Sequence, residues 1–339
     1  MLHQEEDGNV LLQCLTSLRS PPTSVASSTS QLFIGHKSGE LLSIAPDTAT
    51  KKVLTREKVS ITSLAYTHEI LLFGTKKGHI KAHIDGRNVR LGNRHSASIV
   101  AMVPYENENG ELELITAGTD KKILVWKLVV NATATPRTVS LIFIKALYGA
   151  TSPIVSADLS DDNALFACTC ELSSILRVFK VDRDTQLLFT LPNEEHAVQT
   201  IFLTSEVFAT ISNRNTLYLF SPESTQPFQK LRAKGLVGDD QAVLTLFKRL
   251  TPPNEEVPKA VLGFSNGTTV ILEFVDHRLH LLHRIRQDSL PNTAILHNSN
   301  FYLLAGKEEK HARFIINKKA KNTIRVMVPV SSDGPGLSA

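Results

Sequence analysis

The sequence predicts an all-β protein, a single seven-bladed β-propeller with four antiparallel strands in each blade. One short phrase recurs along the chain, its spacing fits one blade per copy, and no apolar stripe at helical spacing persists for three turns. A lone four-stranded blade cannot bury both of its faces, whereas a closed ring of blades buries them and leaves only short edges. The rival interpretation is a pair of smaller β domains meeting near residue 195, and the regular spacing across that point argues against it.

The recurring phrase is an apolar run, a small residue, a polar turn and a second apolar run. Clear copies are Leu32–Ile44, Leu71–His83 and Leu114–Trp126, and weaker copies end at Phe179, Phe220, Leu272 and Ile315. The predicted turns lie 39 to 53 residues apart, at Ser38, Lys77, Asp120, Ser173, Arg214, Asn266 and Glu309. Seven copies at this spacing fill the chain.

The first and fourth strands of the blades should lie between these copies. Runs rich in Val, Ile, Leu and Phe occur there, at Val198–Leu203, Val243–Phe247 and His280–Ile285. Closing the ring needs a strand from one end of the chain; Val10–Leu15 and Thr323–Val328 both qualify, and we favour the N-terminal one. The propeller is therefore expected to span residues 1–330, with 331–339 as a disordered tail.

The third copy carries four polar and aromatic residues in a pattern known from other proteins. His95 precedes the first strand, Thr116 lies in the second, Asp120 in the turn and Trp126 in the third. This set resembles the hydrogen-bonded tetrad of the WD-repeat family, which implies a structural role for all four residues. The other copies end in Ile, His, Phe, Phe, Leu and Ile instead of Trp. The resemblance implies the fold and says little about function.

Composition places the chain among ordinary globular proteins. Hydrophobic residues make up 42% and charged residues 21%, and the net charge of +4 is too small for a dedicated nucleic-acid binder. Three cysteines cannot form a disulfide framework, which suggests a reducing compartment. The acidic start is unlike a signal peptide, and the apolar runs are too short to span a membrane. We expect an intracellular protein, in cytoplasm or nucleus, with no membrane partner.

Each candidate for chemistry has a structural explanation. His79 and His83 have metal-ligand spacing for a helix, but in a strand they lie about 13 Å apart. Cys168 and Cys170 share one face of a buried strand, where core packing is the expected role. No glycine-rich phosphate loop or nucleophile elbow is present. The sequence therefore predicts no enzyme activity, no metal, no cofactor and no small-molecule substrate.

The blade assignment predicts a basic sector on one face. We call "top" the face on which turns between second and third strands, and those between blades, open; the other face is the bottom. Top turns of the first three blades carry eight cations, namely Lys37, Arg56, Lys58, Lys76, Lys77, Arg94, Lys121 and Lys122. Six of them, Lys37, Lys76, Lys77, Arg94, Lys121 and Lys122, are the candidate partner-binding residues. Across the ring the top is expected to be acidic, with Glu194, Glu195, Asp239 and Asp240.

The bottom turns are mostly acidic. They carry Asp85, Glu106, Glu108, Glu111, Asp161, Asp162, Asp182, Asp184, Glu255 and Glu256, with Lys318, Lys319 and Lys321 as the exception. Three insertions also fall there: Asn107–Glu111, Asn131–Arg137 and Thr251–Pro258. We expect a non-catalytic scaffold subunit of a multiprotein complex. The alternative is an RNA-associated propeller, in ribosome or tRNA work, that uses the basic sector; an acidic peptide is another ligand that this sector would attract.

Overall fold

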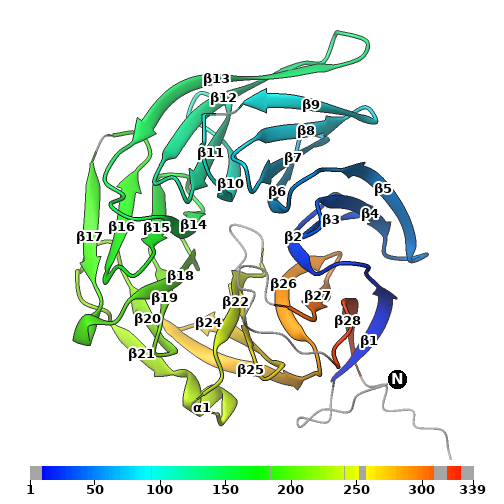
Figure 1. Ribbon diagram of the computed structural model, residues 1–339. Helices are drawn as coiled ribbons and strands as arrows, with labels where there is room; N and C mark the ends of the chain where they lie inside the picture. The colour runs from blue at the N-terminus through cyan, green and yellow to red at the C-terminus, as the bar shows by residue number, and fades with distance from the viewer. Residues whose placement is uncertain are drawn as a thin grey trace, which may run out of the picture.

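The computed structural model describes residues 10–92, 94–183, 185–239, 241–251, 257–308 and 319–329. It confirms the predicted fold: seven four-stranded antiparallel sheets stand around a central axis as the blades of a propeller (Figure 1). The helices in the described part are a five-residue α1 (Ala233–Val237) and a 3-10 turn (Pro192–Glu194). Neither could reach across a bilayer.

In six blades the strands follow chain order from the axis to the rim, and we number the blades 1 to 7. Blade 1 is β2 (Pro22–Ser27), β3 (Leu32–His36), β4 (Glu40–Ala45) and β5 (Thr50–Arg56). Blade 2 is β6 (Ile61–Thr67), β7 (Ile70–Thr75), β8 (Ile80–Ile84) and β9 (Arg87–Gly92). Blade 3 is β10 (Ile99–Glu106), β11 (Leu112–Gly118), β12 (Ile123–Asn131) and β13 (Thr138–Leu147). Blade 4 is β14 (Ile154–Leu159), β15 (Leu165–Cys170), β16 (Ile175–Lys180) and β17 (Gln186–Thr190).

The remaining blades complete the circle. Blade 5 is β18 (Ala197–Phe202), β19 (Phe208–Ser212), β20 (Thr216–Phe220) and β21 (Gln229–Arg232). Blade 6 is β22 (Leu244–Arg249), β23 (Lys259–Phe264), β24 (Thr268–Val275) and β25 (Arg278–Arg286). Blade 7 is β26 (Leu290–His297), β27 (Asn300–Gly306), β28 (Thr323–Pro329) and β1 (Val10–Ser17).

Blade 7 joins the two ends of the chain. Strand β1 pairs antiparallel with β28, with Leu12 opposite Met327, so both candidate closing strands lie in one sheet. Here the seventh copy of the phrase was misplaced: the third strand is Thr323–Pro329, whereas the predicted turn at Glu309 and the run ending at Ile315 lie outside the described residues. The physical reason is that Ile324 packs in the cluster between blades 7 and 1. Two apolar runs, one ending at Ile315 and the other at Thr323–Val328, both fit the third strand of blade 7, and the alternation of apolar residues alone does not distinguish them.

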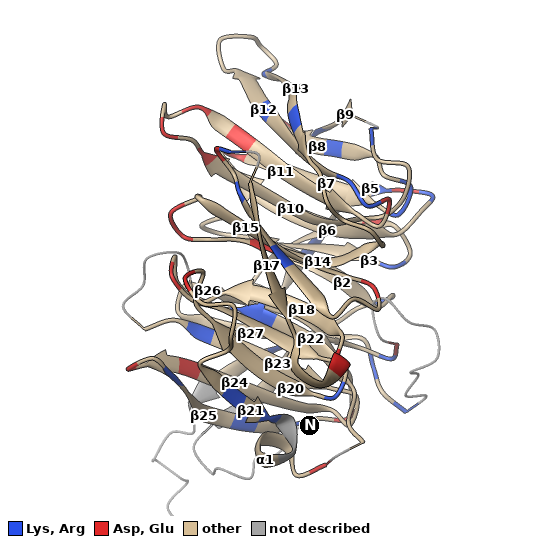
Figure 2. Ribbon diagram, turned by 90° about the vertical axis from the view of Figure 1, so that its left-hand side faces the viewer, with Lys and Arg blue, Asp and Glu red and all other residues tan. Residues whose placement is uncertain are grey.

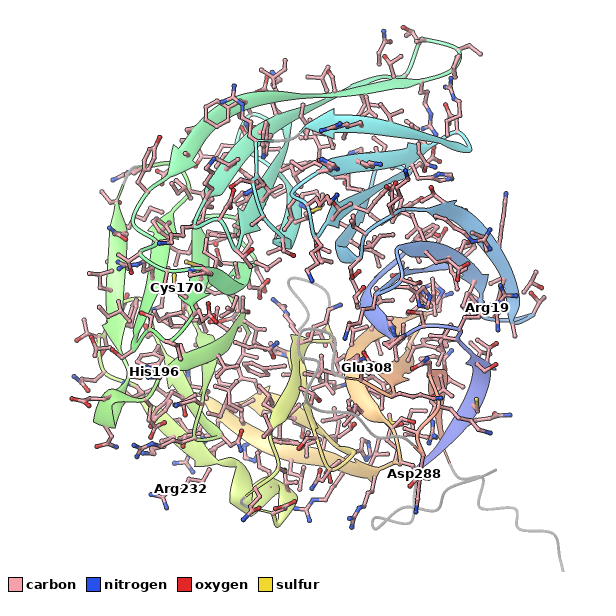
Figure 3. All side chains as sticks on the ribbon, viewed as in Figure 1. Arg19, Cys170, His196, Arg232, Asp288 and Glu308 are labelled. Atoms are coloured by element: carbon pink, nitrogen blue, oxygen red, sulfur yellow. The ribbon has the colours of Figure 1, made fainter. Side chains whose placement is uncertain are left out.

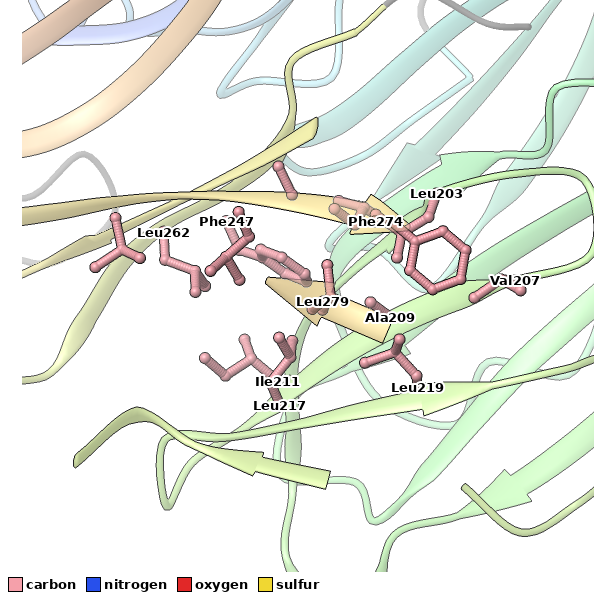
Figure 4. Packing of buried hydrophobic residues seen from close by; sticks show 14 of the residues in the cluster. Leu203, Val207, Ala209, Ile211, Leu217, Leu219, Phe247, Leu262, Phe274 and Leu279 are labelled. Atoms are coloured by element: carbon pink, nitrogen blue, oxygen red, sulfur yellow. The ribbon is translucent and has the colours of Figure 1, made fainter. Parts of the chain in front are cut away.

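One hydrophobic cluster fills each gap between neighbouring blades, so seven clusters replace a single core. Figure 4 shows the cluster between blades 5 and 6, which contains Ile211 and Leu217 from blade 5 and Phe247 and Leu262 from blade 6. Each blade therefore contributes side chains to two clusters, one on each of its faces, and a single blade without its neighbours is not a stable unit.

The small residue of the phrase has a geometric cause. Thr23 Oγ1 on the inner strand of blade 1 donates to Gly35 O (2.8 Å) and to Ile61 O of blade 2 (2.5 Å). A Cβ on Gly35 would lie 2.7 Å from Ile61 Cγ2, closer than real Cβ contacts. Blade 2 repeats the arrangement around Gly74. Glycine at this position therefore lets the next blade's inner strand approach.

Candidate interaction surfaces

The predicted tetrad forms one hydrogen-bond chain in blade 3. Trp126 Nε1 donates to Thr116 Oγ1 (2.9 Å), Thr116 Oγ1 lies 2.9 Å from His95 Nε2, and His95 Nδ1 lies 2.9 Å from Asp120 Oδ1. With Nδ1 protonated, the imidazole donates to the carboxylate and Nε2 accepts the threonine proton. Burial alone would raise the pKa of Asp120, but hydrogen bonds from His95 and from Ser96 N outweigh it and lower that pKa.

These four side chains hold the blade together and offer little to a ligand. Trp126 is only 3% exposed, and it packs between blades 2 and 3 with its ring edge-on to Phe143. His95 and Thr116 are also buried. The set therefore orients the β11–β12 turn, which carries Lys121 and Lys122 on the top face.

The six candidate cations do not line one hollow: five of them fall into two groups, and Lys77 lies apart from both. Lys37 and Lys76 border the mouth of the central channel, whereas Arg94, Lys121 and Lys122 border a separate hollow on the outer side of blade 3. Lys37 is paired with Glu308 of blade 7 at 2.8 Å. In the second group Arg94 lies over the Phe143 ring (4.2 Å), and Lys122 Nζ donates to Arg94 O (3.1 Å). The Arg94 guanidinium and the Lys122 ammonium group are thus held against the blade.

Lys77 belongs to neither group. It is exposed in the β7–β8 turn and borders neither hollow. Among the predicted acids across the ring, Asp240 lies outside the described residues, and Glu195 is a correction: its side chain is buried, not a surface charge. The reason is that Ser212 Oγ donates to the Glu195 carboxylate and pulls it into blade 5.

The mouth of the channel forms a hollow of about 1020 Å³ on the top face. Its blade 1 and 2 side carries Lys37, Lys58 and Lys76, while the opposite side carries apolar residues on turns. Leu172, in the β15–β16 turn, is 79% exposed, and Val243, before β22, is 50% exposed. His196 and Glu171 lie on the same side, and Figure 3 shows His196 across the ring from Glu308. The mouth is thus cationic on one side and apolar on the other.

The acidic residues of the bottom are partly used within the ring. Arg137, in the β12–β13 hairpin of blade 3, contacts the Asp85 carboxylate of blade 2 (2.6 Å) and Glu69 (2.9 Å). Arg249 of blade 6 makes a bidentate pair with Asp161 of blade 4, across blade 5. Figure 2 shows the acidic turns (red) beside β10, β11 and β15 and basic turns (blue) beside β3 and β5. Because the partners of these ion pairs are far apart in the sequence, the sequence alone does not predict which residues pair.

Metal-ligand clusters and buried titratable groups are the remaining features that could carry chemistry. No three His, Cys, Asp or Glu side chains among the described residues converge as metal ligands. Cys168 and Cys170 are both buried between blades 3 and 4, and a hydrogen bond with Cys168 lowers the pKa of Cys170 to about 7. Burial raises the pKa of Asp158 to about 6, against a hydrogen bond from Phe202 N (2.8 Å). These groups lie in interfaces between blades.

Comparison with known proteins gives the fold and nothing finer. No protein-family model matches the sequence, and no curated protein does either. Among solved structures, the RRP9 WD40 repeats superpose with a TM-score of 0.78 at 13% identity, covering 97% of this chain and 100% of that one. A structure of U3-55K gives 0.78 at 14%, covering 96% and 100%. The WD40 β-propeller domain of Doa1 gives 0.69 at 15%, covering 95% and 98%. The architecture is that of WD-repeat propellers.

Proposed function

We propose that this protein is a non-catalytic interaction scaffold, a subunit of a multiprotein complex that binds a partner at the mouth of its central channel. One observation carries the proposal: the hollow at the channel mouth combines exposed apolar side chains with cations on the opposite side. Exposed apolar patches on a rigid ring are typical of protein-binding sites. The channel lysines add attraction for acidic side chains.

The mouth is suited to an acidic peptide with an apolar anchor. Leu172 and Val243 can pack against the anchor, while Lys58 and Lys76 face it from the other side of the same hollow. Because the turns are fixed by the blades, little ordering entropy is lost on binding. An isolated exposed lysine contributes little, so the apolar contacts should provide most of the affinity.

Quantitative affinity purification with mass spectrometry tests the proposal. Leu172→Asp should reduce at least one co-purifying protein tenfold or more, since a charge would enter the apolar side of the mouth. Leu281→Asp is the matched control, because Leu281 is an exposed leucine on the outer strand of blade 6. An identical partner set for wild type and Leu172→Asp would contradict a role for the mouth, provided the two proteins melt alike.

A second candidate function is RNA binding by the outer hollow of blade 3. This hollow, of about 410 Å³, places the exposed ring of Tyr148 (83%) beside Arg94, Lys121 and Lys122. Aromatic rings stack on bases and cations contact phosphates, so this combination fits a single strand.

A labelled twelve-nucleotide oligouridylate is a suitable probe for this second function. Its affinity should fall steeply with salt, with a log–log slope of about −2 for three phosphate contacts. Tyr148→Ala should weaken it about tenfold, which corresponds to about 1.4 kcal/mol of stacking. Binding that ignores both salt and Tyr148→Ala would exclude this function.

A further inference from the structure

Two hollows lie between the outer parts of blades 3 and 4, beside β13 and β17, and we call this space the wedge. Strand β13 has ten residues and β17 only five, and one of the two hollows is bordered by residues of both strands. Within the described residues β12 is the only strand paired with β13, whose outer edge therefore presents free backbone N–H and C=O groups. The outermost strand of every blade has such an edge, and at ten residues β13 is the longest of these strands in the described part. Exposed edges can recruit other strands.

The walls of this wedge are apolar. Ile142 and Ile144 of β13 are 54% and 43% exposed, and Ile144 borders a groove of about 810 Å³ together with Val125 and Val181. A second hollow of about 440 Å³ continues along the wedge and is bordered by Gln186 of β17. Leu188, two residues further along β17, is on the same face as Gln186 and is also exposed. Exposed aliphatic side chains thus stand on both strands that border the wedge, β13 and β17.

The bottom end of the wedge is acidic. Six acidic residues from strands and turns of blades 3, 4 and 5 line the groove: Glu106, Glu108, Glu113, Asp162, Asp182 and Glu223. The cations around the same groove are Lys145, Lys180 and Arg183. Arg183 is paired with the neighbouring Asp182 (3.0 Å), whereas Glu108 and Glu223 have no ion pair within the described residues. The charge is thus opposite in sign to that of the channel lysines.

We propose that this wedge binds an extended basic segment of a partner protein, which adds as a fifth strand to the edge of β13. Backbone hydrogen bonds to β13 would supply affinity, and alternate side chains would pack against Ile142, Ile144 and Leu188. Lysine or arginine stems can cover this apolar wall while their charged ends reach the carboxylates at the bottom. The carboxylates at the bottom end of the wedge repel nucleic-acid phosphates, which argues against RNA as the occupant. This inference rests on the scaffold function and assigns it a second docking surface.

Two ten-residue fluorescent peptides probe the charge requirement, one alternating valine with lysine and the other valine with glutamate. Measured by fluorescence anisotropy at 150 mM salt, the lysine peptide should bind the wild-type protein at least tenfold more tightly than the glutamate peptide does. The double variant Glu108→Lys with Glu223→Lys should lose at least tenfold of that affinity. Asp47→Lys with Glu206→Lys makes the same charge change in exposed turns of blades 1 and 5 and should bind like wild type. Equal binding by the two peptides, or equal loss in both double variants, overturns the proposal.

Strand addition is tested with the lysine peptide methylated on alternate backbone amides. One edge of an added strand faces β13 and the other faces solvent, so methylation of one alternate set should abolish binding and methylation of the other should not. Ile144→Asp should also abolish binding, whereas Val53→Asp, on the exposed outer strand of blade 1, should not. Any other pattern overturns strand addition. No binding to wild type would overturn this inference alone, because the channel mouth is tested separately by Leu172→Asp.

Discussion

Blades 3 and 5 build the same four-stranded sheet from different side chains. In blade 3, Trp126 stands opposite Leu114 and is tied by hydrogen bonds through Thr116 to His95 and Asp120. In blade 5 the corresponding ring is Phe220 opposite Phe208. Phe220 stacks on Phe208 (5.4 Å between centroids), and both meet Phe189 of blade 4. Aromatic packing thus takes the place that the polar chain fills in blade 3.

The second strands show why one blade holds the tetrad and the other does not. Gly118 of blade 3 and Ser212 of blade 5 have the same place in the pairing, opposite the first residue of the inner strand. A Cβ at Gly118 would lie 2.5 Å from Asp120 Oδ1 and 2.7 Å from His95 Nδ1. Ser212 has a side chain in that space and uses it to hold Glu195. The glycine is therefore a condition for the tetrad.

The first prediction is that the two rings are equally important for stability. Trp126→Ala and Phe220→Ala should each lower the free energy of unfolding by about 3–5 kcal/mol, because each removes a large buried side chain. Denaturant titration of both variants measures this. A cost below about 1 kcal/mol for Trp126→Ala alone would show that the ring does not support blade 3.

Gly118→Ala should break the tetrad of blade 3 without removing any of its members. The added methyl group would press on both His95 and Asp120, so we expect a loss of about 1–3 kcal/mol. Ala97→Gly, in the same region, is the control for general effects of altering this loop, because it adds no methyl group against His95 or Asp120. Unchanged stability in Gly118→Ala would mean that the tetrad can shift to admit a side chain.

Sequence reasoning reached the repeated features of this molecule and missed the unrepeated ones. The turns of the first six blades, the ring and the set around Trp126 follow from patterns that recur or that match a known signature, whereas the seventh turn was misplaced. The burial of Glu195 depends on Ser212, the fastening of the β12–β13 hairpin depends on Asp85, and neither partner is close in sequence. The wedge depends on how residues of two neighbouring blades lie relative to one another, which alternation within a single strand does not predict.

Two carboxylates extend the contrast to pH. The pKa of Asp120 is lowered in blade 3, whereas burial raises that of Asp158 in blade 4 to about 6, from 3.8. Between pH 3.8 and about 6, Asp158 loses its proton in the unfolded chain but keeps it in the folded protein. This group therefore makes the protein less stable as the pH rises from about 4 to 6.

Asp158→Asn should remove that dependence. Relative to wild type, the variant should gain on the order of 2 kcal/mol between pH 4 and pH 7.5, since the amide oxygen can still accept from Phe202 N. Thermal melts of both proteins at the two pH values measure the difference. Parallel changes in wild type and variant would show that Asp158 does not titrate in this range.

The smallest expected effect comes from making blade 3 resemble blade 5. Trp126→Phe keeps an aromatic ring against Phe143 but removes the N–H that donates to Thr116. If packing provides most of the stability, the cost should be about 1 kcal/mol for the hydrogen bond plus a smaller amount for lost ring area. The companion variant Thr116→Val removes the acceptor, and the double variant should cost less than the sum of the two, because both lose the same bond. A cost near that of Trp126→Ala would show instead that the polar chain, and not the ring, keeps blade 3 folded.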